Sequence, residues 1–319
     1  MSRVALACAS HTPLLMREEL ADAETVEAVQ ASFDRLGRFV KDFAPARIIQ
    51  FSPDHFHGFH YDLMPSFCVG AAATSYGDYG TAPGPLAVDE DYAVAVLNAV
   101  RDADIDAALS YDMIVDHGFV QIWEIMFGRF SDLPITPIFV NAIGFPLPKY
   151  RRARQLGEAV GRFAARSGER VLFAASGGLS HDPIVPRMSG ASPELRDRLT
   201  GRVPLTREKQ ADRERAVHAA GVAALAGKGS CRPLNPQWDN AFLDMICAGD
   251  WSATDALTPD SVDLAAGAGG NEVLAWVAAA SAAAAAGGGY QVVQRDYRPI
   301  PGWIAGMAVL AAHGRDGAL

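Results

Sequence analysis

Histidines placed beside turn-forming residues are the feature of this sequence that could do chemistry. Four segments set histidines next to Gly, Ser or Pro, and a fifth sets Glu272 behind a glycine pair; they are 10–13, 52–59, 115–119, 176–183 and 269–273. Such a turn fixes the backbone while the ring stays open to a cavity. A lone histidine of this kind is more often a capping or surface residue, but five segments together indicate a polar site.

The residue types in these segments favour a metal site without thiolates. Two histidines and one carboxylate with open coordination positions are the ligand set of non-haem Fe(II) oxygen enzymes. Zinc hydrolases use similar ligands, so the residue types do not choose between the two metals. The sequence contains no HExxH helix, GxSxG elbow or P-loop, and its Gly-rich 267–270 lacks the strand and helix context of a dinucleotide site. The four cysteines are scattered and form no CxxC pair, which argues against a zinc ribbon or a disulfide framework.

The elements that must position these residues alternate between strands and helices. Apolar runs predict strands, and apolar residues spaced by three or four predict helices. The predicted strands are 4–9, 47–51, 135–140 and 171–175, and the predicted helices are 26–40, 88–102, 153–166 and 277–286. This alternation predicts an α/β fold in a single domain over residues 1–319, with a mixed central sheet covered by helices on both faces.

The histidines fall where such a fold binds ligands. His11, His55 and His181 follow predicted strands directly, and His117 lies on a loop that opens the next helix. Ligands of open α/β sheets bind at the carboxyl ends of the strands. We therefore expect these segments to meet at one edge of the sheet.

A proline-flanked segment over about 183–236 differs from the rest of the chain. It carries a charged helix near 206–226. This excursion either covers or flanks the site, or it is a solvated helix with no such role. The composition favours the solvated helix.

Composition excludes several classes of function. The 319 residues carry 28 Lys and Arg against 37 Asp and Glu, a formal charge of −9, which repels nucleic acid and anionic membranes. The longest apolar stretch, 273–286, is shorter than the roughly 18–20 residues of a membrane span. We expect a cytoplasmic protein with neither nucleic acid nor membrane as a partner.

Six blocks in order along the chain carry a specific resemblance. They are SHTPL (10–14), PDHFHGF (53–59), DHGF (116–119), GGLSH (177–181), LNPQWD (234–239) and YRPIPGWIAG (297–306). In this combination the sequence resembles the class III extradiol ring-cleaving dioxygenases, which include the β subunit of protocatechuate 4,5-dioxygenase. It is most similar to the bacterial members that act on 2,3-dihydroxyphenylpropionate.

The resemblance implies a role for five residues. His11, His55 and Glu272 would be the ligands of Fe(2+). His117 would be the proton donor and His181 the proton acceptor. The expected partners are a small-molecule catechol and O2, within a homo-oligomer.

Other residues carry weaker expectations. His57 stands where an Asn is expected, and Asp182 where a Gln is expected. His57 alternates with His55 in an extended segment, so it should face the same side and contact substrate, and Arg298 is the candidate cation for a substrate carboxylate. Asp54 and Asp116 each precede a histidine and could orient a ring by a hydrogen bond, although capping of a turn is at least as good an explanation.

The function implied by the resemblance is extradiol cleavage of a 3-substituted catechol in aromatic catabolism. The favoured substrate is 3-(2,3-dihydroxyphenyl)propionate, which would give 2-hydroxy-6-oxo-nona-2,4-diene-1,9-dioate with both atoms of O2 inserted. Two alternatives stay open: a non-catalytic metal-binding or signalling relative of the same fold, and a zinc-dependent hydrolase.

Overall fold

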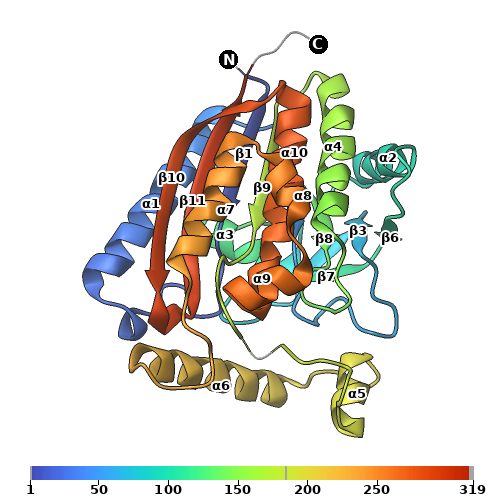
Figure 1. The fold of residues 1–319 in the computed structure, drawn as a ribbon. Coiled ribbons are helices and arrows are strands. Elements are labelled where there is room, and N and C mark those ends of the chain that lie inside the picture. Colours follow the sequence, from blue (N-terminus) through green and yellow to red (C-terminus); the bar gives the residue numbers. More distant parts are fainter. Residues whose placement is uncertain (1, 184, 316–319) are drawn as a thin grey trace.

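A mixed eight-stranded sheet forms the centre of the protein in the computed structural model, which describes residues 2–183 and 185–315 (Figure 1). The strand order is β10-β11-β1-β9-β2-β8-β3-β6. The strands are β1 (Val4–Ala9), β2 (Arg47–Ser52), β3 (Phe67–Gly70), β6 (Ala108–Ser110), β8 (Ile135–Val140), β9 (Val171–Ser176), β10 (Tyr290–Ile300) and β11 (Ala305–Gly314). Strands β1, β9, β2 and β8 are parallel to their neighbours in this group, whereas β11 and β3 flank the group in antiparallel pairing.

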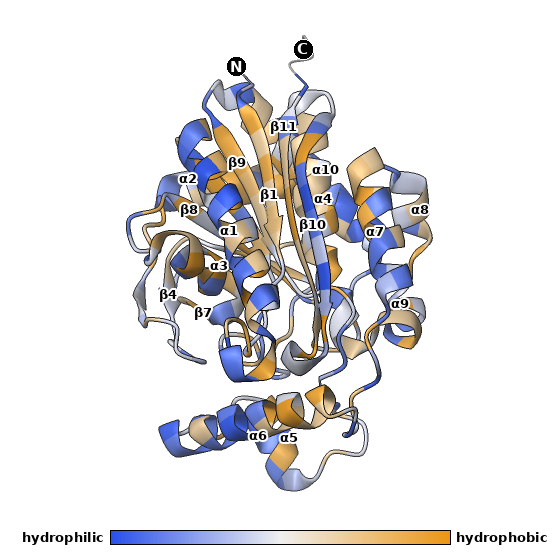
Figure 2. Cartoon of the chain, turned by 90° about the vertical axis from the view of Figure 1, so that its left-hand side faces the viewer, coloured by the Kyte–Doolittle hydropathy of each residue, from blue (hydrophilic) through white to orange (hydrophobic). Residues whose placement is uncertain are grey.

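Helices cover both faces of this sheet, as the alternating pattern predicts. Val4, Leu6 and Cys8 of β1 face one hydrophobic cluster, and Ala5 and Ala7 face the other. The first cluster is covered by α2 (Glu90–Arg101), α4 (Tyr150–Ser167), α7 (Pro236–Ala248), α9 (Pro259–Ala266) and α10 (Val273–Gly287), with α8 (Trp251–Ala256) against α4. The second is covered by α1 (Ala23–Phe43) and α3 (His117–Phe127). Figure 2 shows the apolar strands β1 and β9 inside this arrangement. The predicted α/β fold is confirmed.

A small second sheet carries one loop towards the ends of the central strands. It consists of β4 (Ala73–Ser75), β5 (Gly84–Pro85) and β7 (Met113–Val115), in the order β5-β4-β7. The loop between β4 and β5 contains Asp78, which is fully buried. This sheet was absent from the sequence-based prediction because its strands are only two or three residues long.

The excursion lies across the end of the central sheet, where β1 and β9 end (Figure 1). It contains α5 (Pro193–Leu199) and α6 (Arg207–Leu225). Gln210 and Gly221 of α6 are buried, and a Cβ on Gly221 would lie 2.6 Å from the carbonyl oxygen of Gly302 in the short turn η3 (Pro301–Trp303). The solvated-helix interpretation is therefore wrong. The helix packs through a glycine and through polar contacts, so it lacks the apolar stripe by which a packed helix is normally detected.

None of the helices built from residues 2–183 and 185–315 is long and apolar enough to cross a membrane. The apolar helix α10 is 15 residues long and lies almost completely buried in the core.

Candidate active site

The predicted site residues meet at the end of the sheet where the parallel strands finish. His11 follows β1, His55 follows β2 and His181 follows β9. His117 is the first residue of α3, whose N-cap is Asp116. Glu272 ends the short turn η2 (Ala268–Glu272), directly before α10. Strand ends and helix starts thus bring together five residues that are far apart in the sequence.

His11, His55 and Glu272 face one another at the centre of this cluster. The Nε2 atoms of His11 and His55 each lie 3.4 Å from an oxygen of the Glu272 carboxylate. The His11 and Glu272 side chains are each 2% exposed and that of His55 is 20% exposed. Two imidazoles and one carboxylate therefore present their donor atoms to a common, largely closed space.

The far side of each imidazole is tethered by the protein. His11 Nδ1 forms a hydrogen bond of 2.8 Å with Ser176 Oγ, and His55 Nδ1 forms one of 3.0 Å with Asp116 Oδ2. Metal-binding histidines are typically oriented in this way, because the bonded Nδ1–H leaves the Nε2 lone pair free to bind. The Nε2 atom of His11 is buried and has no hydrogen-bond partner within the described part of the chain. These donors therefore fit a metal ion.

His117 belongs to the same cluster through a different carboxylate. Its backbone N–H donates to Asp78 Oδ1 at 2.8 Å, and its Nδ1 lies 2.6 Å from Asp78 Oδ2. Its Nε2 is also buried without a hydrogen-bond partner among residues 2–183 and 185–315. One ring nitrogen each from His11, His55 and His117 lies within 4.8 Å of the other two. Three imidazoles are thus a second possible ligand set.

His181 contacts the same oxygen of Glu272 as His55 does. Its Nδ1–H donates to the carbonyl oxygen of Leu179 at 2.8 Å, and its Nε2 lies 3.0 Å from Glu272 Oε1. Glycine makes room for the ring, since a Cβ on Gly269 would lie 2.1 Å from His181 Nε2. The backbone N–H of Gly178 donates to the other oxygen, Glu272 Oε2, at 2.8 Å.

Within the cluster, the imidazole of His11 is neutral and the carboxylate of Glu272 is ionised. Burial lowers the pKa of His11 to about 3, so this ring is neutral at pH 7. Burial raises the pKa of Glu272, but the positive charge of His181 and the hydrogen bonds from His181 and His55 outweigh it and hold the pKa well below its usual range. For His55 and His181, burial lowers the pKa, but Asp116 next to His55 and Glu272 next to His181 outweigh it and raise both values. His11 and Glu272 are therefore in the protonation state that metal binding requires, whereas His55 would release a proton when a metal binds.

Asp116 and Asp54 occupy different places in the site. Asp116 accepts hydrogen bonds from the backbone N–H and Nδ1 of His55, and its other oxygen caps α3 at Gly118. Asp54 accepts the backbone N–H groups of His57, Gly58 and Phe59. Asp54 therefore shapes the loop, whereas Asp116 contacts a histidine ring directly.

His57 contacts Asp116, the carboxylate that also binds His55. The predicted extended segment is wrong, because the bonds from Asp54 close a turn in which Phe56 has a φ of 62°. His57 does face the same carboxylate as His55, with Nδ1 at 3.2 Å from Asp116 Oδ2, and its side chain is 1% exposed. Its Nε2 lies 3.4 Å from Gln210 Oε1 of α6.

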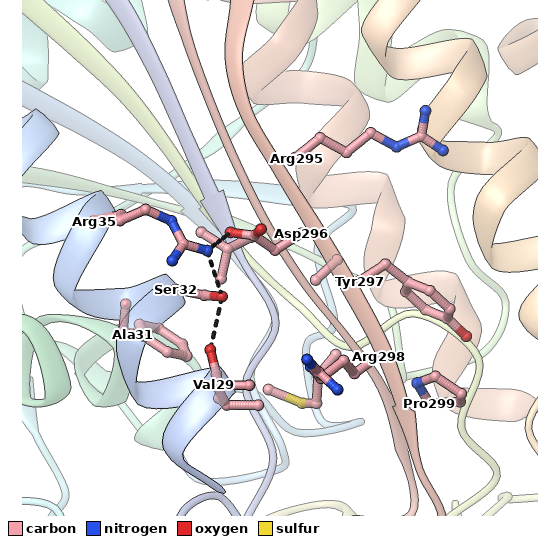
Figure 3. A pocket seen from close by; sticks show the side chains of 14 residues that line it. Val29, Ala31, Ser32, Arg35, Arg295, Asp296, Tyr297, Arg298 and Pro299 are labelled. Carbon is pink, nitrogen blue, oxygen red and sulfur yellow. Dashed lines mark hydrogen bonds and ion pairs between the residues drawn. The ribbon is translucent and has the colours of Figure 1, made fainter. Parts of the chain in front are cut away.

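Arg298 lies outside the histidine cluster. Figure 3 shows Arg298 near Val29, Ser32 and Arg35 of α1. These residues line a cavity of about 670 Å³ between α1 and β10. Side chains alternate along a strand, and its neighbour Tyr297 donates to Asp239 Oδ2 at 2.6 Å. The predicted carboxylate-binding cation thus lines a cavity whose lining contains none of the four histidines.

Several residues of the site were missed in the sequence. Asp78 binds His117, Ser176 binds His11, and the ring centroid of Tyr79 lies 4.9 Å from that of His117. Asp78 stands in a Gly-Asp-Tyr-Gly turn, which is a loop signal. No spacing rule connects this turn to His117, 39 residues further along the chain.

Comparisons with known proteins agree with this architecture. A family model for the catalytic LigB subunit of aromatic ring-opening dioxygenase matches residues 5–308. The chain is 48% identical over 310 residues to a 2,3-dihydroxyphenylpropionate/2,3-dihydroxicinnamic acid 1,2-dioxygenase of Rhodococcus sp, covering 97% of this chain and 98% of the relative. It is 45% identical over 315 residues to a similarly named protein of Pseudomonas putida, with 97% and 98% coverage. A crystal structure of an uncharacterized Escherichia coli K12 protein has the same fold, with a TM-score of 0.50 at 14% identity, covering 96% of this chain and 98% of that one.

Proposed function

The chain belongs to the LigB family of aromatic ring-opening dioxygenases, and we propose from this premise that it cleaves 3-(2,3-dihydroxyphenyl)propionate with O2 beside a ring hydroxyl. Membership of this family makes it an enzyme and confirms the resemblance found in the sequence. The observation that carries the proposal is the convergence of two tethered imidazoles on the Glu272 carboxylate. Both atoms of O2 would enter the product, 2-hydroxy-6-oxo-nona-2,4-diene-1,9-dioate, so no external reductant is consumed.

His11, His55 and Glu272 would hold Fe(II) in this proposal. When bound, the metal supplies a template on which the two catechol oxygens and O2 lie side by side and exchange electron density. The protein contributes the three ligands and their orientation, through Ser176 for His11 and Asp116 for His55. With only three protein ligands, the site would leave coordination positions of the metal open for the substrates.

His181 would accept the proton of a catechol hydroxyl. Its Nδ1–H is committed to the carbonyl oxygen of Leu179, so its Nε2 is the atom that can take up a proton. That atom lies 3.0 Å from Glu272 Oε1. With Glu272 serving as a metal ligand, His181 Nε2 would be available to accept the proton of the substrate.

His117 would donate a proton when the O–O bond breaks. The Asp78 carboxylate at Nδ1 orients the ring in the way that a buried Asp orients the catalytic histidine of other enzymes. The Nε2 atom, with no hydrogen-bond partner in the described structure, points into the space shared with His11 and His55. His117 is thus held for proton transfer without needing to bind the metal.

The proposal is tested with protein purified without oxygen and reconstituted with either Fe(II) or Zn(II). We expect one O2 consumed per catechol, and a yellow ring-cleaved product, with Fe(II) only. Binding of Zn(II) in preference to Fe(II), with no O2 consumed on any catechol, would favour the hydrolase. No product from any catechol, with iron bound, would favour a non-catalytic relative.

The ligand assignment is tested by metal content. Glu272→Gln should lose the bound metal, whereas His117→Phe should keep about one metal per chain and lose turnover. The reverse result would replace the proposed ligands by the set of three imidazoles. A homo-oligomeric assembly is also part of the proposal and is tested by light scattering on the eluting protein.

A further inference from the structure

Two arginines of the excursion face a small cavity beside the histidine cluster. Arg198 of α5 and Arg213 of α6 both line it, and its volume is about 20 Å³. This is room for one or two water molecules, and a carboxylate group is of similar size. Arg213 Nη2 lies 3.5 Å from the carbonyl oxygen of His55, so the cavity adjoins a proposed metal ligand.

The remaining wall of the cavity is mainly apolar. Phe56, Leu199, Val203 and Leu205 contribute to it. The backbone N–H of Tyr61 donates to the carbonyl oxygen of Leu199 at 2.7 Å, which fixes the end of α5 against the loop that follows His55. A short hydrocarbon chain could therefore pack along this wall before its charged end reaches the two guanidinium groups.

These two arginines lack a counterion within the described residues, as do Arg196 and Arg207 of the same segment, but unlike those two they line the cavity. Arg187, Arg202, Arg215 and Arg232 each form an ion pair with an aspartate. Within residues 2–183 and 185–315, no carboxylate lies within 4.0 Å of Arg198 or Arg213. Burial and the positive charge of Arg213 lower the pKa of Arg198. Two facing cations without a partner are unfavourable, and an anion between them would relieve this repulsion.

We propose that Arg198 and Arg213 bind the side-chain carboxylate of the catechol substrate, and that Phe56 and Leu199 pack against its methylene groups. This inference rests on the proposed function and identifies the group that selects among catechols. Guanidinium groups bind carboxylates through paired hydrogen bonds, which suits them to this role. The excursion would then determine specificity, in addition to closing the end of the sheet.

The net charge of the molecule makes such a local site necessary. A formal charge of −9 repels an anionic substrate at long range. Attraction must therefore come from groups that contact the substrate. Arg213 fits this requirement, because its Nη2 lies 3.5 Å from the carbonyl oxygen of His55, and it forms no ion pair within the described residues, whereas Arg215 on the same helix pairs with Asp212.

The test compares two substrates that differ only in charge. The enzyme loaded with Fe(II) is assayed on 3-(2,3-dihydroxyphenyl)propionate and on 3-propylcatechol, which lacks the carboxylate. For Arg198→Ala and Arg213→Ala, we expect kcat/KM on the first substrate to fall about 10- to 100-fold, mainly through KM. On 3-propylcatechol, kcat/KM should change less than about twofold, since no charged contact is removed. Arg213→Lys should restore part of the loss.

Matched controls come from the same segment. Arg215→Ala removes an exposed and paired arginine two positions from Arg213, and Arg202→Ala does the same near Arg198. Both should leave the two substrates unaffected. Metal content is measured for every variant, so that a displaced His55 is not mistaken for lost substrate binding.

The outcomes separate this inference from the proposed function. If the unmodified enzyme cleaves neither catechol with Fe(II) bound, the proposed function fails. If it cleaves both, and the two alanine variants lose equally on both substrates or on neither, only the arginine subsite is overturned. A binding measurement without turnover adds a second readout: 3-phenylpropionate should compete with substrate in the unmodified enzyme and about 10- to 100-fold less well in the variants.

Discussion

Each imidazole of the site uses one nitrogen for the protein and offers the other to the shared space. Ser176, Asp116, Asp78 and the carbonyl oxygen of Leu179 bind the four Nδ1 atoms of His11, His55, His117 and His181. These partners differ in charge. The neutral hydroxyl next to His11 leaves burial to hold the ring neutral, whereas the carboxylate next to His55 raises the pKa of that ring. The chemistry of each histidine thus depends on the group that binds its Nδ1 atom.

Substitution of Asp78 tests whether the group bonded to Nδ1 determines the role of a histidine. Asp78→Asn keeps the shape but removes the charge that supports His117, so we expect kcat to fall about 10- to 100-fold. The bound metal should stay at the level of the unmodified enzyme, because Asp78 contacts none of the proposed ligands. Turnover at several pH values and metal analysis measure the two effects.

The exposed Asp106 supplies a control for this substitution. Asp106→Asn removes the same charge at a distance from the site and should change neither quantity. Loss of metal in Asp78→Asn, with turnover per bound metal unchanged, would contradict the assignment of His117 to proton transfer.

At the scale of elements, the sequence predicted what depends on local periodicity. Apolar runs located β1, β2, β8 and β9, and the spacing of apolar residues located α1. Because ligand-binding groups of an α/β sheet gather at the carboxyl ends of its strands, these strands also predicted that His11 and His55 lie near each other. The resemblance to a known family, and no local pattern, was needed to choose Glu272.

What could not be predicted depends on packing between distant segments. The small sheet β5-β4-β7 positions the loop that brings Asp78 to His117. Its strands are too short to give a periodic pattern in the sequence. Helix α6 packs through Gly221, which no hydrophobic pattern marks. Arg298 stands on the face of β10 that meets α1, and the sequence alone does not fix the register that puts it there.

The crossing of α4 and α10 illustrates how tightly such packing is built. A Cβ on Gly161 would lie 2.3 Å from the carbonyl oxygen of Ala282, which is backbone and cannot move aside. Gly161→Ala gains about 1 kcal/mol of helix propensity, but overpacking in a core costs about 1–3 kcal/mol, so we expect a net loss of stability. Denaturant unfolding measures the change. Arg162→Ala, at an exposed position of the same helix, should stay within about 0.5 kcal/mol of the unmodified protein. A gain of stability in Gly161→Ala would show that the helices can separate freely.

Asp182 attaches the end of the excursion to the segment beside His181. It accepts hydrogen bonds from the Arg232 guanidinium and from the backbone N–H of Ala268, and the Arg232 bond is the main cause that lowers the Asp182 pKa to about 2. A carboxyl with a lowered folded-state pKa stabilises the protein above its unfolded pKa of about 3.9, and loses that effect as the pH falls towards 2. Asp182→Asn should therefore cost about 1 kcal/mol at pH 7, because the exposed Arg232 is screened by water.

The pH dependence distinguishes this ion pair from simple loss of packing. The stability difference between Asp182→Asn and the unmodified protein should shrink between about pH 4 and pH 2. Asp106→Asn again serves as the control, since its stability should follow the unmodified protein. A difference that stays constant over this range would mean that the charge of Asp182 contributes nothing.

At the scale of the whole molecule, the site joins parts of the chain that are far apart. The proposed ligands stand at 11, 55 and 272, and the arginines of the proposed subsite come from the excursion between them. Bringing such distant segments together costs loop-closure entropy. Folding of the core already includes this cost, because it places β1, β2 and β9 in one sheet. We propose on this basis that residues 1–319 unfold as one cooperative unit.

Metal removal tests this cooperativity directly. A metal that binds only the folded state stabilises it by RT ln(1 + [M]/Kd), about 4 kcal/mol when the free metal is a thousandfold above Kd. For a chain of this size that energy raises the melting temperature by an amount on the order of 5–10 °C. Because the ligands come from segments near both ends of the chain, the shift should apply to a single transition followed by near-ultraviolet and far-ultraviolet circular dichroism alike. Glu272→Gln should abolish the shift, whereas His117→Phe should keep it. Two separate transitions, with only one sensitive to metal, would mean that the excursion or another segment unfolds on its own.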